Sequence, residues 1–352
     1  MHTLQDPPVP DPDVVPRPAP PWPADLAGAI LRTLVYADLF QYSLTVAEIA
    51  HYLIGAGARP DEVAPVLDTD PALAGALGTR DGFYFLRGRE ALVDLRTARA
   101  RAAAGLWRRA ARYSRLLRHF PFVRMIAVTG ALAMDNVAGH ADIDLLVVST
   151  PGRVWICRRL LVLAVHGIRL LGDELCPNFI LAADSLALAQ QDLFTAHELA
   201  QMRPLAGYAL YTEMFARNPW VRTLLPNVQP WPAAHGAPER RSLAQRLGEW
   251  LLRPRRLDRW EQWEMERLRR KLAAPASPDA EVACTASQCK GHTGYYRAQV
   301  LRRYEARLHT LLDQANPSGG GAAQAVAQGQ AQASGGGRPS QDQVGTGLVE
   351  VA

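Results

Sequence analysis

The chain has 352 residues, of which 48% are hydrophobic and 21% are charged, with a formal net charge of +5 and four cysteines. This length is typical of two or three domains, and so few cysteines exclude a small scaffold held together by disulfides. No apolar run reaches the roughly 20 residues that cross a membrane, and no apolar signal peptide is recognisable. We therefore expect a cytoplasmic protein without a membrane partner.

The two ends of the chain differ in composition from its middle. Residues 1–25 are rich in proline, and residues 313–352 consist largely of glycine, alanine, glutamine and serine. Neither segment has enough apolar side chains to offset the entropy lost on ordering, so both are predicted to be disordered.

Residues 26–92 show the pattern of three helices followed by a β-hairpin. Thr45 and Glu48 have the spacing of a capping box that opens the second helix. A short third helix starts at Pro60, and an Asp-Gly pair at residues 81–82 marks the turn of the hairpin. This order of elements is typical of a winged-helix module.

The third helix of this module has the wrong charge for reading DNA. A recognition helix presents basic side chains to the major groove, whereas this one carries Asp61, Glu62 and Asp68, with Arg59 only at its start. We therefore favour a docking or scaffolding role, and DNA binding by the module stays as an alternative.

Two stretches of the chain are strongly basic. Residues 96–124 contain nine arginines, and residues 239–271 contain eleven basic residues against six acidic ones. The first stretch lies on a predicted amphipathic connecting helix over residues 93–120. Such stretches either contact phosphates or form a solvated helix face whose arginines pair with acids elsewhere, and the helical spacing favours the second interpretation.

Residues 123–150 contain the pattern that points to chemistry. A short apolar strand ends at a turn with Gly130, one or two helical turns follow, and a second strand begins near Asp142. The Leu-Leu-Val-Val run at residues 145–148 is typical of a strand covered on both faces.

Asp142 and Asp144 lie two residues apart at the start of that second strand. Side chains at this spacing point to the same face of a strand, so the two carboxylates are expected to be neighbours. Like charges so close repel unless a cation lies between them, and carboxylate oxygens suit Mg²⁺. We therefore predict a Mg²⁺ site at Asp142 and Asp144.

This segment resembles the nucleotidyltransferase signature of the DNA polymerase β superfamily. That signature is a glycine turn followed by a small residue, here Gly130 and Ala131, and then an Asp-x-Asp strand, here residues 142–144. The resemblance implies an α+β fold with a small mixed-sheet core at residues 121–205, flanked by the winged helix and a C-terminal helical region.

The resemblance also implies an activity: Mg²⁺-dependent transfer of a nucleotidyl group from a nucleoside triphosphate to an acceptor hydroxyl. The acceptor is a small molecule, a protein or an RNA end. Asp142 and Asp144 would be the catalytic metal ligands. The residues implied in nucleotide binding are Gly130, Ala131, Asn136 and Arg153. Arg158 and Arg159 are further candidates for contacts with the triphosphate.

Two positions depart from the family pattern. Ala131 replaces the usual serine or second glycine, and Asn178 occupies the central polar position of the next predicted strand, where the family has a third carboxylate. Asp184, beyond that strand, is the candidate to replace it. These departures leave open a catalytically weak or inactive nucleotide-binding regulatory module, and a winged-helix DNA-binding regulator is a third alternative.

Residues 206–312 are predicted to be a helical region with a proline-rich linker near residues 226–238. Before it, Thr195 and Glu198 have capping-box spacing. Near its end, Cys284, Cys289 and His292 form a C-x₄-C-x₂-H pattern that lacks a fourth ligand at zinc-site spacing, and a loop ahead of the last helix is the simpler interpretation. Lys290 in this segment is considered as a phosphate contact.

Overall fold

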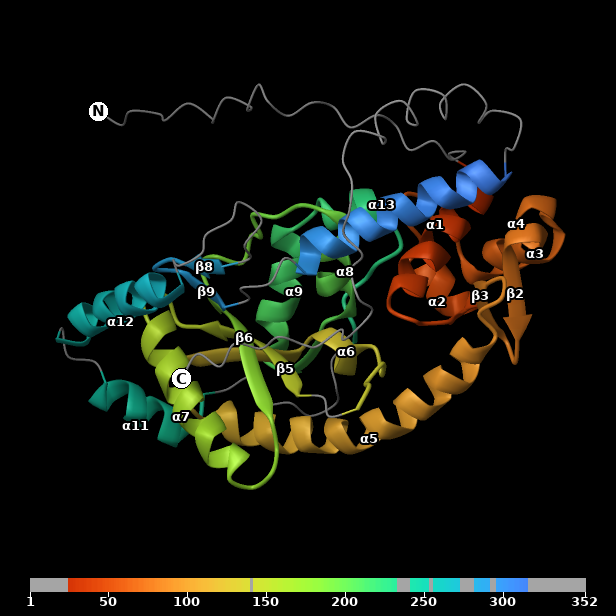
Figure 1. The fold of residues 1–352 in the computed structure, drawn as a ribbon. Coiled ribbons are helices and arrows are strands. Elements are labelled where there is room, and N and C mark those ends of the chain that lie inside the picture. The colour runs from red at the N-terminus through yellow and green to blue at the C-terminus, as the bar shows by residue number, and fades with distance from the viewer. Residues whose placement is uncertain are drawn as a thin grey trace, which may run out of the picture.

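The computed structural model describes residues 25–139, 142–232, 241–252, 256–272, 282–291 and 296–315. Over these residues the protein has a mixed α+β architecture with two β-sheets, of three and six strands (Figure 1). The predicted disorder of residues 1–24 and 316–352, residues 233–238 of the predicted linker, and His292 fall outside the described residues. The predicted disordered tail began too early, because residues 313–315 belong to the last helix. Among the residues that are described, no helix combines the length and apolarity needed to cross a membrane.

The N-terminal region folds around the small antiparallel sheet. Its elements in chain order are α1 (Leu26–Leu39), β1 (Leu44–Thr45), α2 (Val46–His51), α3 (Pro60–Thr69), α4 (Pro71–Ala76), β2 (Leu77–Arg80) and β3 (Phe83–Leu86). The predicted capping box is confirmed, because Thr45 and Glu48 make both of its hydrogen bonds. The hairpin turns at Asp81 and Gly82, both with positive φ. Strand β1 and helix α4 were not predicted, since each is too short to show a periodic pattern.

Helix α5 (Ala91–Leu117) runs as one long helix from the small sheet to the large one (Figure 1). Several of its arginines pair with acids, as the second interpretation of the basic stretch requires. Arg96 lies 2.6 Å from a carboxylate oxygen of Glu48, and Arg109 and Arg112 both pair with Asp173.

The large sheet has the strand order β7-β4-β5-β6-β9-β8. Its strands are β4 (Val123–Val128), β5 (Ile143–Ser149), β6 (Leu175–Ala182), β7 (Arg203–Ala206), β8 (Val282–Cys284) and β9 (Gln288–Gly291). Only β5 and β6 pair in parallel, and helix α7 (Val154–Arg169) connects them; the other pairs are antiparallel.

Helices cover both faces of this sheet, as the continuous apolar run in β5 predicts. Leu146 and Val148 face a core formed with α1, α8 (Leu193–Gln201), α9 (Tyr208–Arg217) and α13 (Tyr296–Ala315). Leu145 and Val147 face a second core formed with α5, α7 and α12 (Arg256–Leu272). We call these the α8 face and the α7 face of the sheet.

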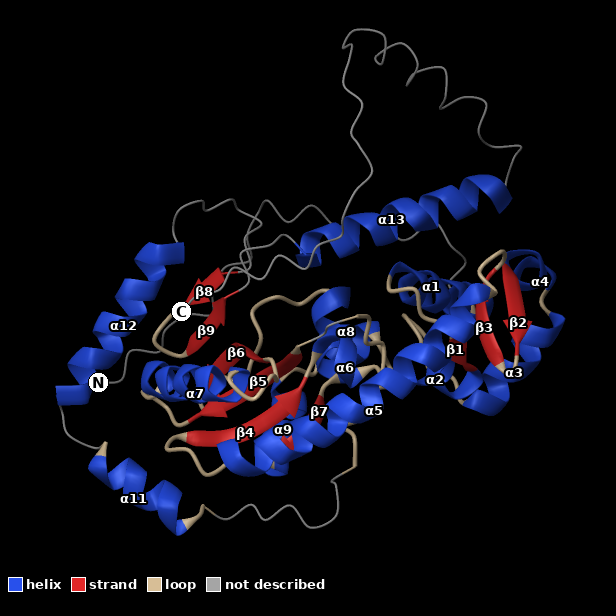
Figure 2. Cartoon of the chain, turned by 60° about the horizontal axis from the view of Figure 1, so that its bottom comes forward, coloured by secondary structure: helices blue, strands red, loops and turns tan. Residues whose placement is uncertain are grey.

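Helix α13 closes the α8 face by joining the two ends of the described chain. Tyr304 of α13 meets Tyr36 of α1 edge to face, with 5.6 Å between ring centroids. Arg307 of α13 also lies 3.8 Å from Asp38 of α1. Two further short helices, α10 (Val221–Leu224) and α11 (Leu243–Leu251), complete the C-terminal region, and α11 and α12 lie at the end of the molecule away from the N-terminal region (Figure 2).

The sheet extends beyond the predicted core at residues 121–205. The segment predicted as a loop ahead of the last helix is instead the β8–β9 hairpin, and β9 pairs with β6. The region over 206–312 is therefore not purely helical. The hairpin strands have three and four residues and lack apolar alternation, so no periodicity identified them.

Candidate functional site

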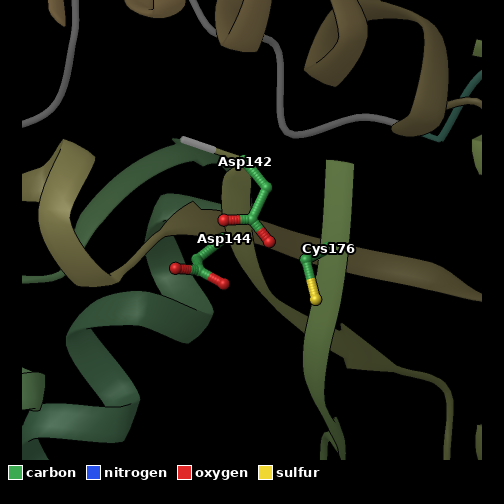
Figure 3. A group of neighbouring side chains, drawn as sticks. All are labelled: Asp142, Asp144 and Cys176. Atoms are coloured by element: carbon green, nitrogen blue, oxygen red, sulfur yellow. The ribbon is translucent and has the colours of Figure 1, made fainter. Parts of the chain in front are cut away.

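Asp142 and Asp144 meet at the start of β5, on the α8 face. One carboxylate oxygen of each, together with the sulfur of Cys176, lies within 4.8 Å of the others (Figure 3). Cys176 belongs to the neighbouring strand β6, where it is the register partner of Asp144. The predicted convergence of the two carboxylates is therefore confirmed, and Cys176 is a third member that the sequence interpretation missed.

Asn178 reaches this group because β6 contains a bulge. Leu145 pairs with Pro177 and Leu146 with Phe179, so Asn178 is an extra residue between two ladder positions. A bulge re-aims the side chain it carries. The Asn178 amide nitrogen donates a hydrogen bond of 2.9 Å to Oδ1 of Asp144.

The turn at Gly130 closes directly on Asp144. Gly130 has φ +65°, and a Cβ atom there would lie 2.6 Å from Oδ2 of Asp144. The backbone N–H of Thr129 also donates to the Asp144 carbonyl at 3.1 Å. Only glycine tolerates both the conformation and the close approach. Helix α6 (Gly130–Ala133) then begins, with Ala131 exposed in its first turn.

The electrostatics of this group disfavour charge on Asp144. Burial, followed by the carboxylates of Asp142 and Glu198, raises the pKa of Asp144 to about 8, and the hydrogen bond from Asn178 offsets part of this rise. No basic side chain among the described residues contributes to this balance. A bound cation would therefore favour full ionisation of the pair.

The donor set fits a hard divalent cation. Mg²⁺ is commonly held by one or two carboxylates, with water and substrate phosphates completing its shell, and Asp142 and Asp144 supply two. Burial, with the charges of Asp144 and Asp142, raises the pKa of Cys176 to about 12. The thiol therefore stays protonated near neutral pH and is no ligand for such an ion.

Asp184 does not belong to this site. Strands β5 and β6 are parallel, and Ser149 pairs with Ala182 at the far end from the Asp144–Cys176 pair. Five residues along β5 span about 16 Å, and Asp184 lies beyond that end, exposed to solvent. Its candidate role as a catalytic carboxylate was therefore wrong.

Arg153 is at the same far end and was also assigned wrongly. It immediately precedes α7, and its guanidinium donates a hydrogen bond of 2.7 Å to Asp258 of α12. Arg158 approaches Glu264 of α12 at 3.8 Å, and Arg159 lies beside Trp260 and Glu264. These arginines connect α7 to α12 and do not face the carboxylate pair.

Asn136 has a structural role at the edge of the site. Its amide nitrogen donates to the carbonyl of Phe40 at 2.9 Å, and its side-chain oxygen accepts from Arg99 at 3.0 Å. Its side chain is thus committed to contacts with α5 and the end of α1, which corrects its assignment to nucleotide binding.

Helix α8 contributes Glu198, which the sequence interpretation treated only as a capping residue. The observed N-cap is Asp192, whose carboxylate accepts from the N–H of Thr195 at 2.9 Å, so the predicted Thr195–Glu198 capping box is wrong. His197, which precedes Glu198, is buried and stacks on Tyr36 with 3.8 Å between the ring centroids. Burial lowers the pKa of His197 to about 4, so it is a neutral packing residue near neutral pH.

Lys290 lies on the same sheet face as the carboxylate pair. It is the register partner of Phe179, with its ammonium 5.8 Å from that ring. Phe179 packs with Leu146 on the α8 face, and directly paired residues point to one face. The lysine therefore stands about 10 Å, two strand spacings, from β5.

No family model, no curated protein and no solved structure matches this chain. The features that define the site are therefore those of the chain itself. They are a carboxylate pair at the start of a buried strand, a glycine turn in contact with one carboxylate, an amide that orients it, and a lysine on the neighbouring hairpin.

Proposed function

We propose that this protein is a Mg²⁺-dependent nucleotidyltransferase of the DNA polymerase β-like class, which transfers a nucleotidyl group from a nucleoside triphosphate to an acceptor hydroxyl. The observation that carries the proposal is the contact between the Gly130 turn and Asp144, whose carboxylate lies beside that of Asp142. A glycine turn closing on two metal-binding carboxylates is the arrangement that this class needs to bring phosphates and metal together.

In this proposal, different residues of the site have different roles in binding the triphosphate. Asp142 and Asp144 would hold Mg²⁺, which when bound neutralises phosphate charge and aligns the groups for in-line attack. Asn178 fixes the rotamer of Asp144 by its hydrogen bond. Backbone N–H groups at the Gly130 turn supply donors to phosphate oxygens, and Lys290 supplies a positive charge on the same sheet face.

The N-terminal region supports a winged-helix interpretation, with a docking role rather than DNA recognition. Helix α3 is the one that would enter a major groove, and its Asp61 and Glu62 are exposed. Arg59 at its start is already paired with Asp61 at 3.0 Å. The module instead touches the site region, because the hydroxyl of Tyr42 donates to the carbonyl of Met134, just after α6, at 2.8 Å.

A second candidate function is a nucleotide-binding regulatory module without transfer activity. The specific observation in its favour is the identity of the two β6 residues that lie beside Asp144. Cys176 and Asn178 occupy the positions nearest the pair, and neither supplies the third carboxylate that acts as base or shared metal ligand in the class.

Two measurements test these proposals. The first is the thermal unfolding midpoint with each nucleoside triphosphate, with and without Mg²⁺; we expect stabilisation only when both are present. The second is incorporation of label from the α-phosphate of the stabilising nucleotide into small-molecule, protein or RNA acceptors.

The matched variants are Asp142→Asn and Asp184→Asn, which remove one carboxylate at each end of the same strand pair. We expect Asp142→Asn to abolish both signals and Asp184→Asn to leave them unchanged. Mg²⁺-dependent stabilisation without transfer to any acceptor would select the regulatory function. Equal signals from wild type and Asp142→Asn would refute both functions.

The role of Lys290 has its own test, because Lys271 is the only other lysine of the chain. We expect Lys290→Met to weaken triphosphate binding about tenfold while changing monophosphate binding little, and Lys271→Met to do neither. Equal weakening of both nucleotides by Lys290→Met would assign the lysine to the structure of the hairpin.

A further inference from the structure

The β8–β9 hairpin carries two cysteines that the proposed function does not use. Cys284 and Cys289 are direct register partners across the two strands. Both pack against the α7 face of the sheet, Cys289 as a buried core residue and Cys284 partly exposed. They thus stand on the face opposite Lys290 and the carboxylate pair.

The hairpin geometry brings the two thiols together. The N–H of Thr285 donates to the Gln288 carbonyl at 2.9 Å, so the adjacent pair, Cys284 and Cys289, occupies a non-hydrogen-bonded position of the ladder. At such positions opposing Cα atoms are about 4.5 Å apart, which lies within the range that a disulfide spans. The two thiols are close enough for each to shift the pKa of the other.

The surroundings make Cys284 the more reactive of the two. The hydrogen bond from Cys289 lowers the pKa of Cys284, and the charges of Arg158 and Arg269 lower it further. The same hydrogen bond and burial raise the pKa of Cys289. A thiolate is the nucleophile in thiol–disulfide exchange, so Cys284 attacks and Cys289 resolves.

We propose that Cys284 and Cys289 form a redox-modified site, in which a small-molecule disulfide oxidises the pair to a cross-strand disulfide. The Cys284 thiolate attacks one sulfur of the reagent, forming a mixed disulfide and releasing one thiolate. The Cys289 thiol then loses its proton and displaces the second reagent thiolate. The protein loses two electrons and two protons, and the reagent disulfide becomes two thiols.

The test uses the full-length protein with oxidised glutathione, followed by intact mass, thiol counting and peptide mapping. We expect two of the four thiols to disappear, the mass to fall by two hydrogens, and one peptide to contain a Cys284–Cys289 disulfide that dithiothreitol reverses. Cys284→Ser should retain its three thiols. Cys176→Ser, the matched control, should still form the disulfide.

Three outcomes of the glutathione reaction would overturn the proposal. These are a mixed disulfide with glutathione that persists on Cys284, a disulfide that includes Cys157 or Cys176, and full retention of all four thiols. Because two neighbouring thiols can also bind a thiophilic metal, Zn²⁺ binding to the reduced protein is measured as well. Stoichiometric binding of Zn²⁺ to the reduced protein that is lost in both Cys284→Ser and Cys289→Ser would replace the disulfide by a metal site. None of these outcomes depends on nucleotide binding.

Discussion

Asp144 and Asp173 are carboxylates in the same part of the large sheet, and they are satisfied in opposite ways. Asp173, just before β6, is buried and accepts from Arg109 at 2.9 Å, from Arg112 at 3.1 Å and from the hydroxyl of Tyr113. Among the described residues, the amide of Asn178 is the one side chain that donates to the Asp144 carboxylate, and a second carboxylate lies beside it. Under the proposed function, Asp173 serves the fold and is surrounded by its own donors, whereas Asp144 would serve a ligand and is left short of them.

The largest expected effect follows from Asp144→Asn. Because the folded-state pKa of Asp144 is raised to about 8, the native state holds a proton that the unfolded state releases near pH 4, so stability falls as pH rises between those values. The shift bounds the cost at about 5 kcal/mol. At pH 8 without Mg²⁺, we expect Asp144→Asn to raise the free energy of unfolding in urea by at least about 2 kcal/mol. A lower free energy of unfolding for Asp144→Asn would contradict the view that Asp144, unlike Asp173, lacks stabilising partners in the fold.

The next effect concerns Gly130, which makes room for Asp144. Gly130→Ala places a methyl group against the Asp144 carboxylate in a left-handed conformation, and we expect it to cost about 2 kcal/mol of unfolding free energy. Gly152 is the matched control, since it has φ +68° with no atom within 4 Å of a Cβ. Gly152→Ala should cost only about 1 kcal/mol. Similar losses for both variants would show that the carboxylate contact is unimportant.

Asp173→Asn should give the opposite sign from Asp144→Asn. The substitution removes the charge that Arg109 and Arg112 share, but both arginines are half exposed. We therefore expect a loss of about 1 to 2 kcal/mol, measured by urea unfolding, with Mg²⁺ and nucleotide binding unchanged. A loss of nucleotide binding in this variant would mean that the two carboxylates act as one group.

The smallest effect is the pH dependence of metal binding. Mg²⁺ must displace the proton that Asp144 holds below pH 8, so its affinity should rise with pH and level off above that value. By calorimetry without nucleotide, we expect binding about tenfold tighter at pH 9 than at pH 7. A pH-independent affinity would place the metal away from Asp144.

Local patterns predicted much of the fold. The capping box at Thr45, the helices around it and the strand that carries Asp144 all follow from residues close in sequence. The same holds for the carboxylate pair, since a spacing of two suffices to place both side chains on one face. The glycine turn was also predicted, although its contact with Asp144 was not.

The remaining features depend on which strands pair and in which direction. Arg153 and Asp184 are near the carboxylates in sequence, yet the parallel pairing of β5 and β6 places them at the opposite end of the strands. Cys176 and Glu198 approach Asp144 through register and helix packing, which no local pattern encodes. The β8–β9 hairpin joins the sheet through edge pairing of strands of three and four residues, which are too short to show a periodic pattern.

The closure of the α8 face by α1 and α13 has a consequence for how the protein is made. The two helices pack together although more than 250 residues separate them. During synthesis, the core on the α8 face lacks its contacts with α13 until that helix has left the ribosome. A nascent chain therefore holds part of this apolar layer open for most of its translation.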